Sequence, residues 1–182
     1  MSKIQTYIAL LRGINVGGYH KVPMADLRKE MKALGYTNVQ TLLNSGNIIF
    51  DGDRDEEEKI GRKIGRHLEN VFGFSIPVLV RTKETFSALY NADPFEDVEV
   101  TDDIRLYVSF LKEVPQNQLN LPWISEDESF QIIAIRDKEV CSVLDLSVAK
   151  TPKGMDALEQ LFGKEITTRN WNTVDRIAKK LG

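Results

Sequence analysis

The sequence predicts an α+β fold made of two ferredoxin-like halves, each an antiparallel sheet with its helices packed on one face. Over residues 1–82, strand-like and helix-like segments follow one another in the order β-α-β-β-α-β, which is the order of the split βαβ unit. Residues 104–182 give a degenerate form of the same order, β-α-β-β-α with an extra terminal helix. We therefore expect a structural duplication, although the two halves share no visible sequence repeat.

The elements of the first half follow from hydrophobic periodicity. Residues 4–12 are apolar and β-rich and end at a glycine, which predicts a buried strand. Residues 24–34 carry Leu27, Met31 and Leu34 at helical spacing, with Gly35 where a C-terminal cap belongs. The remaining expected elements are strands at 39–43 and 48–50, a helix with its apolar stripe at Ile60, Ile64, Leu68 and Val71, and a strand at 76–81.

This topology brings two loops together. In a ferredoxin-like unit the first two strands run parallel and the third runs antiparallel to them. The loop after the first strand, residues 12–21, and the turn at residues 44–47 then lie at the same end of the sheet. We expect these two loops to be neighbours in space.

The second half begins after a linking region. We expect a first subdomain at 1–82, a linking helix and loop at 83–103 with its helix at 85–91, and a second subdomain at 104–182. Within the second subdomain, the expected elements are a strand at 104–111, a short helix at 116–121, a hairpin of strands 130–136 and 140–146, and helices at 155–162 and 174–181.

The composition indicates a globular protein of the cytoplasm. The 182 residues are 42% hydrophobic and 28% charged, and their formal net charge is −3. This acidic balance argues against nucleic acid and against anionic membranes as partners. Cys141 is the only cysteine, so no intrachain disulfide forms. Residues 1–3 run directly into the first strand, and every apolar stretch has the length of a strand, so we expect neither a signal peptide nor a membrane span.

The loop at residues 12–21 is the strongest candidate for a binding site. Its glycines let the backbone turn sharply and expose N–H groups, and its polar side chains are donors that suit phosphate or carboxylate. Pro23 then opens a helix whose N-terminal amides favour anions. The glycine spacing fits neither the Walker loop nor the dinucleotide fingerprint. A long turn that only packs the protein together is the competing interpretation. The expected ligand-binding residues in this loop are Arg12, Gly13, Asn15, Gly17, Gly18 and Lys21.

Two further segments supply supporting candidates. Asn47 ends the turn at 44–47 and is expected to support the ligand, although a hairpin turn alone also explains the asparagines and glycine there. Arg169 lies in a polar segment that opens the last helix, with Thr168 or Asn170 as the expected cap. Trp171 is interpreted as an anchor of that helix rather than as a stacking platform.

The sequence indicates no metal and no cofactor. His20 and His67, the two histidines, show no metal-ligand spacing with cysteine or carboxylates. The acidic run at residues 51–58 is interpreted as a solvated helix start, and Cys141 as a core residue. Ser45 has no identifiable base in the sequence, so no catalytic residue is assigned.

Several motifs resemble one bacterial family. RGINVGG at 12–18, VPM at 22–24 and LNSGN at 43–47 are joined by FGFSIPVLVRT at 72–82 and TTRNWNTV at 167–174. Together they resemble a family catalogued as a domain of unknown function, number 1697. The resemblance implies an α+β fold of two ferredoxin-like halves and implies no established activity, substrate or catalytic residue.

The functional expectation is a protein that binds a small anionic ligand at the 12–21 loop. One alternative is a hydrolase or transferase that acts on phosphoryl or acyl groups, with the same loop stabilising an oxyanion. Another is a protein-interaction module that uses exposed strand edges or a groove between the halves. The sequence does not indicate an oligomeric state.

Overall fold

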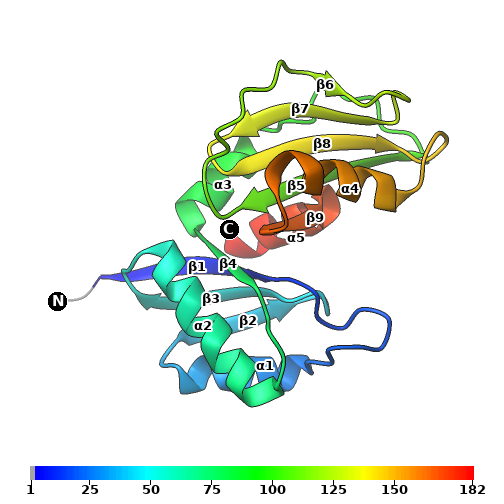
Figure 1. Ribbon diagram of the computed structural model, residues 1–182. Helices are drawn as coiled ribbons and strands as arrows, with labels where there is room; N and C mark the ends of the chain where they lie inside the picture. The colour runs from blue at the N-terminus through cyan, green and yellow to red at the C-terminus, as the bar shows by residue number, and fades with distance from the viewer. Residues whose placement is uncertain (1–2) are drawn as a thin grey trace. The chain divides into compact units, whose positions relative to one another are not determined.

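The computed structural model describes residues 3–182 and divides into two compact units (Figure 1). The first unit contains the chain up to Ala88 together with Arg176–Gly182, and the second contains Leu89–Asp175. Two helices, α3 (Lys83–Asn91) and α5 (Trp171–Leu181), each contribute residues to both units.

The first unit has the ferredoxin-like strand order. Its four strands lie in the order β2-β3-β1-β4, and all neighbouring pairs are antiparallel, so β1 and β2 run parallel as expected. Two helices complete the unit, and both lie on one face of the sheet (Figure 1). The elements are β1 (Ile4–Leu11), α1 (Met24–Ala33), β2 (Thr37–Leu42), β3 (Asn47–Asp53), α2 (Glu57–Phe72) and β4 (Val78–Thr82).

The central strand β1 is buried on both faces. Tyr7, Ala9 and Leu11 point into the core that the helices cover, and Ile8 and Leu10 on the opposite face are also fully buried. Burial of both faces explains why this segment is almost continuously apolar rather than alternating. From α1 and α2, the buried residues of this core are Leu27, Met31, Ile60, Ile64 and Leu68, as the helical periodicity predicts. Val71, expected on the same stripe, is 44% exposed.

Close contact between α2 and the edge of the sheet at β4 depends on two glycines. A Cβ atom at Gly61 would lie 2.9 Å from the carbonyl oxygen of Val78, which is closer than real Cβ atoms approach. Gly65, one turn later, is similarly close to the Ile76 carbonyl, at 3.3 Å. The absence of side chains at these two positions lets the helix backbone approach the edge of the sheet.

The second unit has the same strand order, extended by one short strand. Its sheet runs β6-β7-β8-β5-β9, and all pairs are antiparallel. Without β6, this order is that of a ferredoxin-like unit in which α4 connects the third and fourth strands. The elements are β5 (Ile104–Leu111), β6 (Trp123–Ile124), β7 (Phe130–Arg136), β8 (Glu139–Asp145), α4 (Thr151–Phe162) and β9 (Ile166–Asn170).

Two expectations for the second unit are wrong. Residues 116–121 form no helix, because this stretch lies between Pro115 and Pro122 and is rich in asparagine, so it runs as an irregular segment into β6. The strand β9 was not expected, because its residues were interpreted as the entry to the last helix. Its first three residues, Ile166, Thr167 and Thr168, are β-branched and pair with β5. β9 therefore supplies the fourth strand that the duplicated order lacked.

Candidate functional site

The loop at residues 12–21 forms a short β-hairpin. Val16 and Tyr19 pair in an isolated antiparallel bridge, and the Tyr19 N–H donates to the Val16 carbonyl at 3.0 Å. Gly17 and Gly18 between them have φ values of 58° and 78°, so the tip is a two-residue turn with both central residues in the left-handed region. Hairpins favour this turn because its twist matches that of the two strands, and glycine suits both central positions because each needs a positive φ. These glycines build a hairpin tip, where the sequence had suggested an amide cradle.

Asn15 joins this hairpin to the turn at residues 44–47. Its Nδ2 donates to the carbonyls of Val22 (3.0 Å) and Asn44 (2.8 Å), and its Oδ1 accepts from the Val22 N–H at 2.8 Å. The expected proximity of the two loops is therefore confirmed. The Asn15 amide stabilises the contact between the two loops, because its Nδ2 and its Oδ1 both form hydrogen bonds with the backbone.

Asn47 and Gly46 likewise hold the turn in place. Asn47 is fully buried, and its Nδ2 donates to the Leu42 carbonyl at 2.9 Å and to Ser45 Oγ at 3.0 Å. The Gly46 carbonyl accepts from the Leu11 N–H at 2.8 Å, which ties the turn to the end of β1. Asn47, expected to support a ligand, is the first residue of β3, and its amide donates to the Leu42 carbonyl, before the turn, and to Ser45 Oγ, within it.

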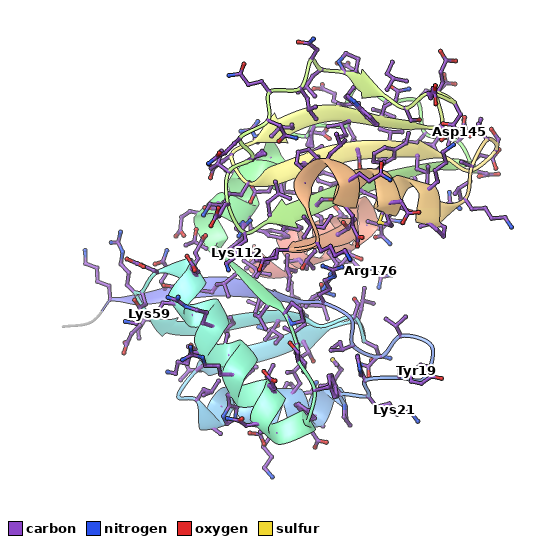
Figure 2. All side chains as sticks on the ribbon, viewed as in Figure 1. Tyr19, Lys21, Lys59, Lys112, Asp145 and Arg176 are labelled. Atoms are coloured by element: carbon purple, nitrogen blue, oxygen red, sulfur yellow. The ribbon has the colours of Figure 1, made fainter. Side chains whose placement is uncertain are left out.

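The tip of the hairpin presents a different set of side chains. Tyr19 is 77% exposed and Val16 is 66% exposed, and Lys21 is also exposed. Figure 2 shows Tyr19 and Lys21 on this projecting loop. Tyr19 and Val16 were not among the expected site residues, although the pattern Val-Gly-Gly-Tyr, two β-formers around a Gly-Gly pair, is typical of a hairpin.

The base of the hairpin is fixed by neighbouring contacts. The imidazole of His20 stacks on the ring of Phe74 with centroids 4.3 Å apart, and its Nδ1 lies 3.2 Å from the Gly13 carbonyl. The Arg12 N–H donates to the Pro77 carbonyl at 3.0 Å, and the Arg12 side chain is half-buried. Gly13 has φ 74° with open space around it, so only its backbone conformation calls for glycine.

Arg169 lies in the second unit, on β9. Burial lowers its pKa to about 10, so it still carries its charge at neutral pH, and its Nη1 donates to the Thr168 carbonyl at 3.2 Å. The next residue caps α5, because Asn170 Oδ1 accepts from the Thr173 N–H at 2.9 Å. Trp171 stacks on Tyr90 with centroids 5.6 Å apart, in agreement with its expected anchoring role.

The described residues, 3–182, hold no group of three or more histidine, cysteine and carboxylate side chains that could bind a metal ion. Cys141 is buried within β8, and desolvation raises its pKa to about 12, so its thiol stays protonated. In the same part of the chain, no helix combines the length and the apolar character that a bilayer crossing requires.

Comparisons with known proteins place this geometry in context. Residues 4–140 match a family described as "Protein of unknown function (DUF1697)". Among solved structures, the chain is similar to the conserved bacterial protein SP0830 from Streptococcus pneumoniae. The two share 26% identity and a TM-score of 0.69, and the match covers 99% of this chain and 100% of that one. The search of curated proteins gave no match.

Proposed function

Since the chain belongs to the DUF1697 family of proteins of unknown function, we propose from its own geometry that it binds a small anionic ligand at the 12–21 hairpin. Side chains at the tip, rather than backbone amides, make the contact. Lys21 supplies the positive charge for a phosphate or carboxylate, and Tyr19 supplies a flat face for the rest of the ligand.

The observation that carries this proposal is the contrast between a fixed scaffold and its exposed tip. Asn15 holds the hairpin through three hydrogen bonds to Val22 and Asn44. On that scaffold Tyr19 remains 77% exposed. Lys21, two residues later in the sequence, is also exposed. Loops that are held by a scaffold often carry binding residues, and an exposed tyrosine there offers a flat ring face and a polar hydroxyl.

A thermal-shift titration with inorganic phosphate and adenosine 5′-monophosphate tests the proposal. A ligand that binds only the folded state raises the melting temperature with increasing concentration. We expect both probes to do so, adenosine monophosphate more strongly because its ring can lie on Tyr19. Lys21→Ala should reduce both responses, and Tyr19→Ala should reduce only the advantage of the nucleotide.

The matched control is Lys29→Ala, which removes an exposed lysine of α1 and should leave both responses intact. A Lys21→Ala protein that responds as the wild type does would overturn the hairpin site. The same variants assayed with p-nitrophenyl phosphate and p-nitrophenyl acetate test the hydrolase alternative, which requires turnover that Lys21→Ala removes.

One observation favours protein interaction as a second candidate function. Val16 and Tyr19 are both exposed at the hairpin tip, and paired apolar side chains on a projecting loop suit a protein partner. Under this alternative Lys21→Ala leaves the response to both small probes unchanged. The double variant Val16→Ser and Tyr19→Ser would then reduce self-association in sedimentation velocity, with the wild-type chain as reference.

A further inference from the structure

A cleft of about 820 Å³ lies on the first unit between α2 and the end of the sheet that carries Ile4 and Asp53. None of the expected site residues lines it. Its walls and floor combine cationic, acidic and apolar side chains. The ionisable residues among them are Asp51, Asp53, Asp55, Lys59, Arg62, Lys63, Arg66 and His67.

One wall of the cleft is a basic stripe along α2. Lys59, Lys63 and Arg66 are spaced four and three residues apart, which places them on one side of the helix. The core stripe Ile60 and Ile64 runs beside them, so α2 separates an apolar face from a cationic one. Figure 2 labels Lys59 near the start of this helix.

The cations of this stripe differ in how far they are neutralised. Lys59 Nζ pairs with Asp55 Oδ2 at 3.1 Å. Lys63 Nζ lies 5.3 Å from the centre of the Tyr36 ring and 3.4 Å from the Leu34 carbonyl oxygen. Across residues 3–182, no carboxylate forms an ion pair with Lys63 or Arg66. Lys63 is close enough to Asp55 to help lower the pKa of that carboxyl, so the charge of Lys63 is partly balanced by Asp55.

Two carboxylates of the acidic wall already accept hydrogen bonds or pair with cations within the protein. The Asp51 carboxylate accepts from Thr6 Oγ1 at 2.6 Å and from Asn38 Nδ2 at 2.8 Å. The Glu56 N–H and Lys59 lower the pKa of Asp55, so this carboxylate stays ionised and bound to its partners. Asp53, the last residue of β3, is exposed and lines the cleft, where it can accept a hydrogen bond from a ligand hydroxyl.

The floor is apolar and is shaped by Gly52. Leu34, Tyr36 and Ile60 line it, and Tyr36 is 8% exposed. A Cβ atom at Gly52 would lie 2.8 Å from Tyr36 Cδ1, so the tyrosine ring lies directly against the strand backbone. Burial, with a smaller contribution from Asp55, raises the Tyr36 pKa, which keeps its hydroxyl protonated.

We propose that this cleft binds a small phosphomonoester, with the phosphate between Lys63 and Arg66 and the ester body on the apolar floor. Two cations one turn apart, neither of them in an ion pair within 4 Å among the described residues, suit the double negative charge of a phosphate monoester. The floor of Leu34, Tyr36 and Ile60 gives an apolar ester group an advantage over inorganic phosphate. This site is independent of the hairpin.

An NMR titration of the ¹⁵N-labelled full chain with phenyl phosphate and inorganic phosphate tests this proposal. Saturable amide shifts are expected in α2 and at residues 34–37 and 51–53, with phenyl phosphate bound about fivefold more tightly than phosphate because of the apolar floor. Lys63→Gln and Arg66→Gln should each weaken phenyl phosphate about tenfold, the loss typical of one charge-assisted contact.

Two control variants separate this site from the hairpin. Lys29→Gln and Lys21→Ala should both leave the cleft titration unchanged, and a native-like spectrum of each variant shows that it is folded. The double variant Lys63→Gln/Arg66→Gln titrating as the wild type does would overturn the site. Equal affinity for the two probes would overturn the role of the floor, and shifts confined to residues 12–21 would assign the binding to the hairpin alone.

Discussion

At the scale of single residues, two glycines with the same backbone requirement have different surroundings. Gly18 and Gly46 have φ values of 78° and 84°, a region that side-chain-bearing residues rarely occupy. A Cβ at Gly46 would lie 2.6 Å from Leu11 Cβ and 2.9 Å from Ile14 Cδ1. A Cβ at Gly18 would have no surrounding atom within 4 Å. Backbone strain and steric overlap can therefore be measured separately.

We expect Gly18→Ala to lower the free energy of unfolding by about 1 kcal/mol, the cost of placing alanine in the left-handed region. Gly46→Ala should lower it by about 3 kcal/mol, because overpacking against Leu11 and Ile14 adds to the same strain. Urea denaturation of the two variants beside the wild type checks the difference. Equal losses would show that the turn relaxes and that Gly46 is kept for its φ value alone.

The sequence predicted that the two loops meet, and the structure adds the contacts that their asparagines make. Asn15 and Asn47 are donors in a glycine-rich region, and that chemistry alone suits a ligand as well as it suits a backbone carbonyl. The structure shows that the Asn15 amide engages Val22 and Asn44, and that Asn47 holds its own turn. Which of the two uses applies depends on distances that arise only when the loops meet, and composition does not encode those distances.

At the scale of elements, hydrophobic periodicity predicted the first unit well. Strand-like and helix-like segments follow one another in the order of the split βαβ unit, and that unit has the observed strand order and brings the 12–21 and 44–47 loops together. The failures, residues 116–121 and β9, are short segments whose conformation depends on partners. β9 exists because β5 offers a free edge to Ile166 and its neighbours, and no local pattern of five residues encodes that pairing.

A single carboxylate organises the turn between β6 and β7 and links it to α4. Asp127 Oδ1 accepts from Ser125 Oγ at 2.8 Å, from Ser129 Oγ at 2.7 Å and from the Ser129 N–H at 3.1 Å. Its Oδ2 pairs with Lys153 of α4. Lys153, followed by the Ser129 and Ser125 contacts, holds the Asp127 pKa well below its usual range.

This arrangement predicts an acid-dependent contribution to stability. A carboxyl whose pKa is lower in the folded than in the unfolded state stabilises the fold above the unfolded value, near 4, and that stabilisation is lost as the pH falls toward the folded value. We expect Asp127→Asn to lower the melting temperature at pH 7 and to lose less between pH 5 and pH 2 than the wild type does. Asp156→Asn, at an exposed carboxylate of α4, is the control and should follow the wild-type profile. Parallel pH profiles for Asp127→Asn and wild type would contradict the prediction.

At the scale of the whole molecule, the end of the chain belongs with its beginning. Arg176–Gly182 forms part of the first unit, although the entire second unit separates it from Ala88 in sequence. The helical periodicity of the last segment predicted α5 but carried no information about which unit its second half joins. Ile177, fully buried in this half of α5, is the residue that tests the assignment.

Ile177→Ala should destabilise the protein by about 3 kcal/mol, the typical loss when a buried isoleucine is truncated. Because Ile177 belongs to the first unit, hydrogen exchange followed by mass spectrometry should show faster exchange across β1, β3 and β4. The strands β7 and β8 of the second unit should keep their wild-type protection. Lys180→Ala, at an exposed position three residues later, controls for changes in the helix itself and should alter neither unit. Faster exchange confined to β7 and β8 would place Ile177, and with it the last turns of the chain, in the second unit.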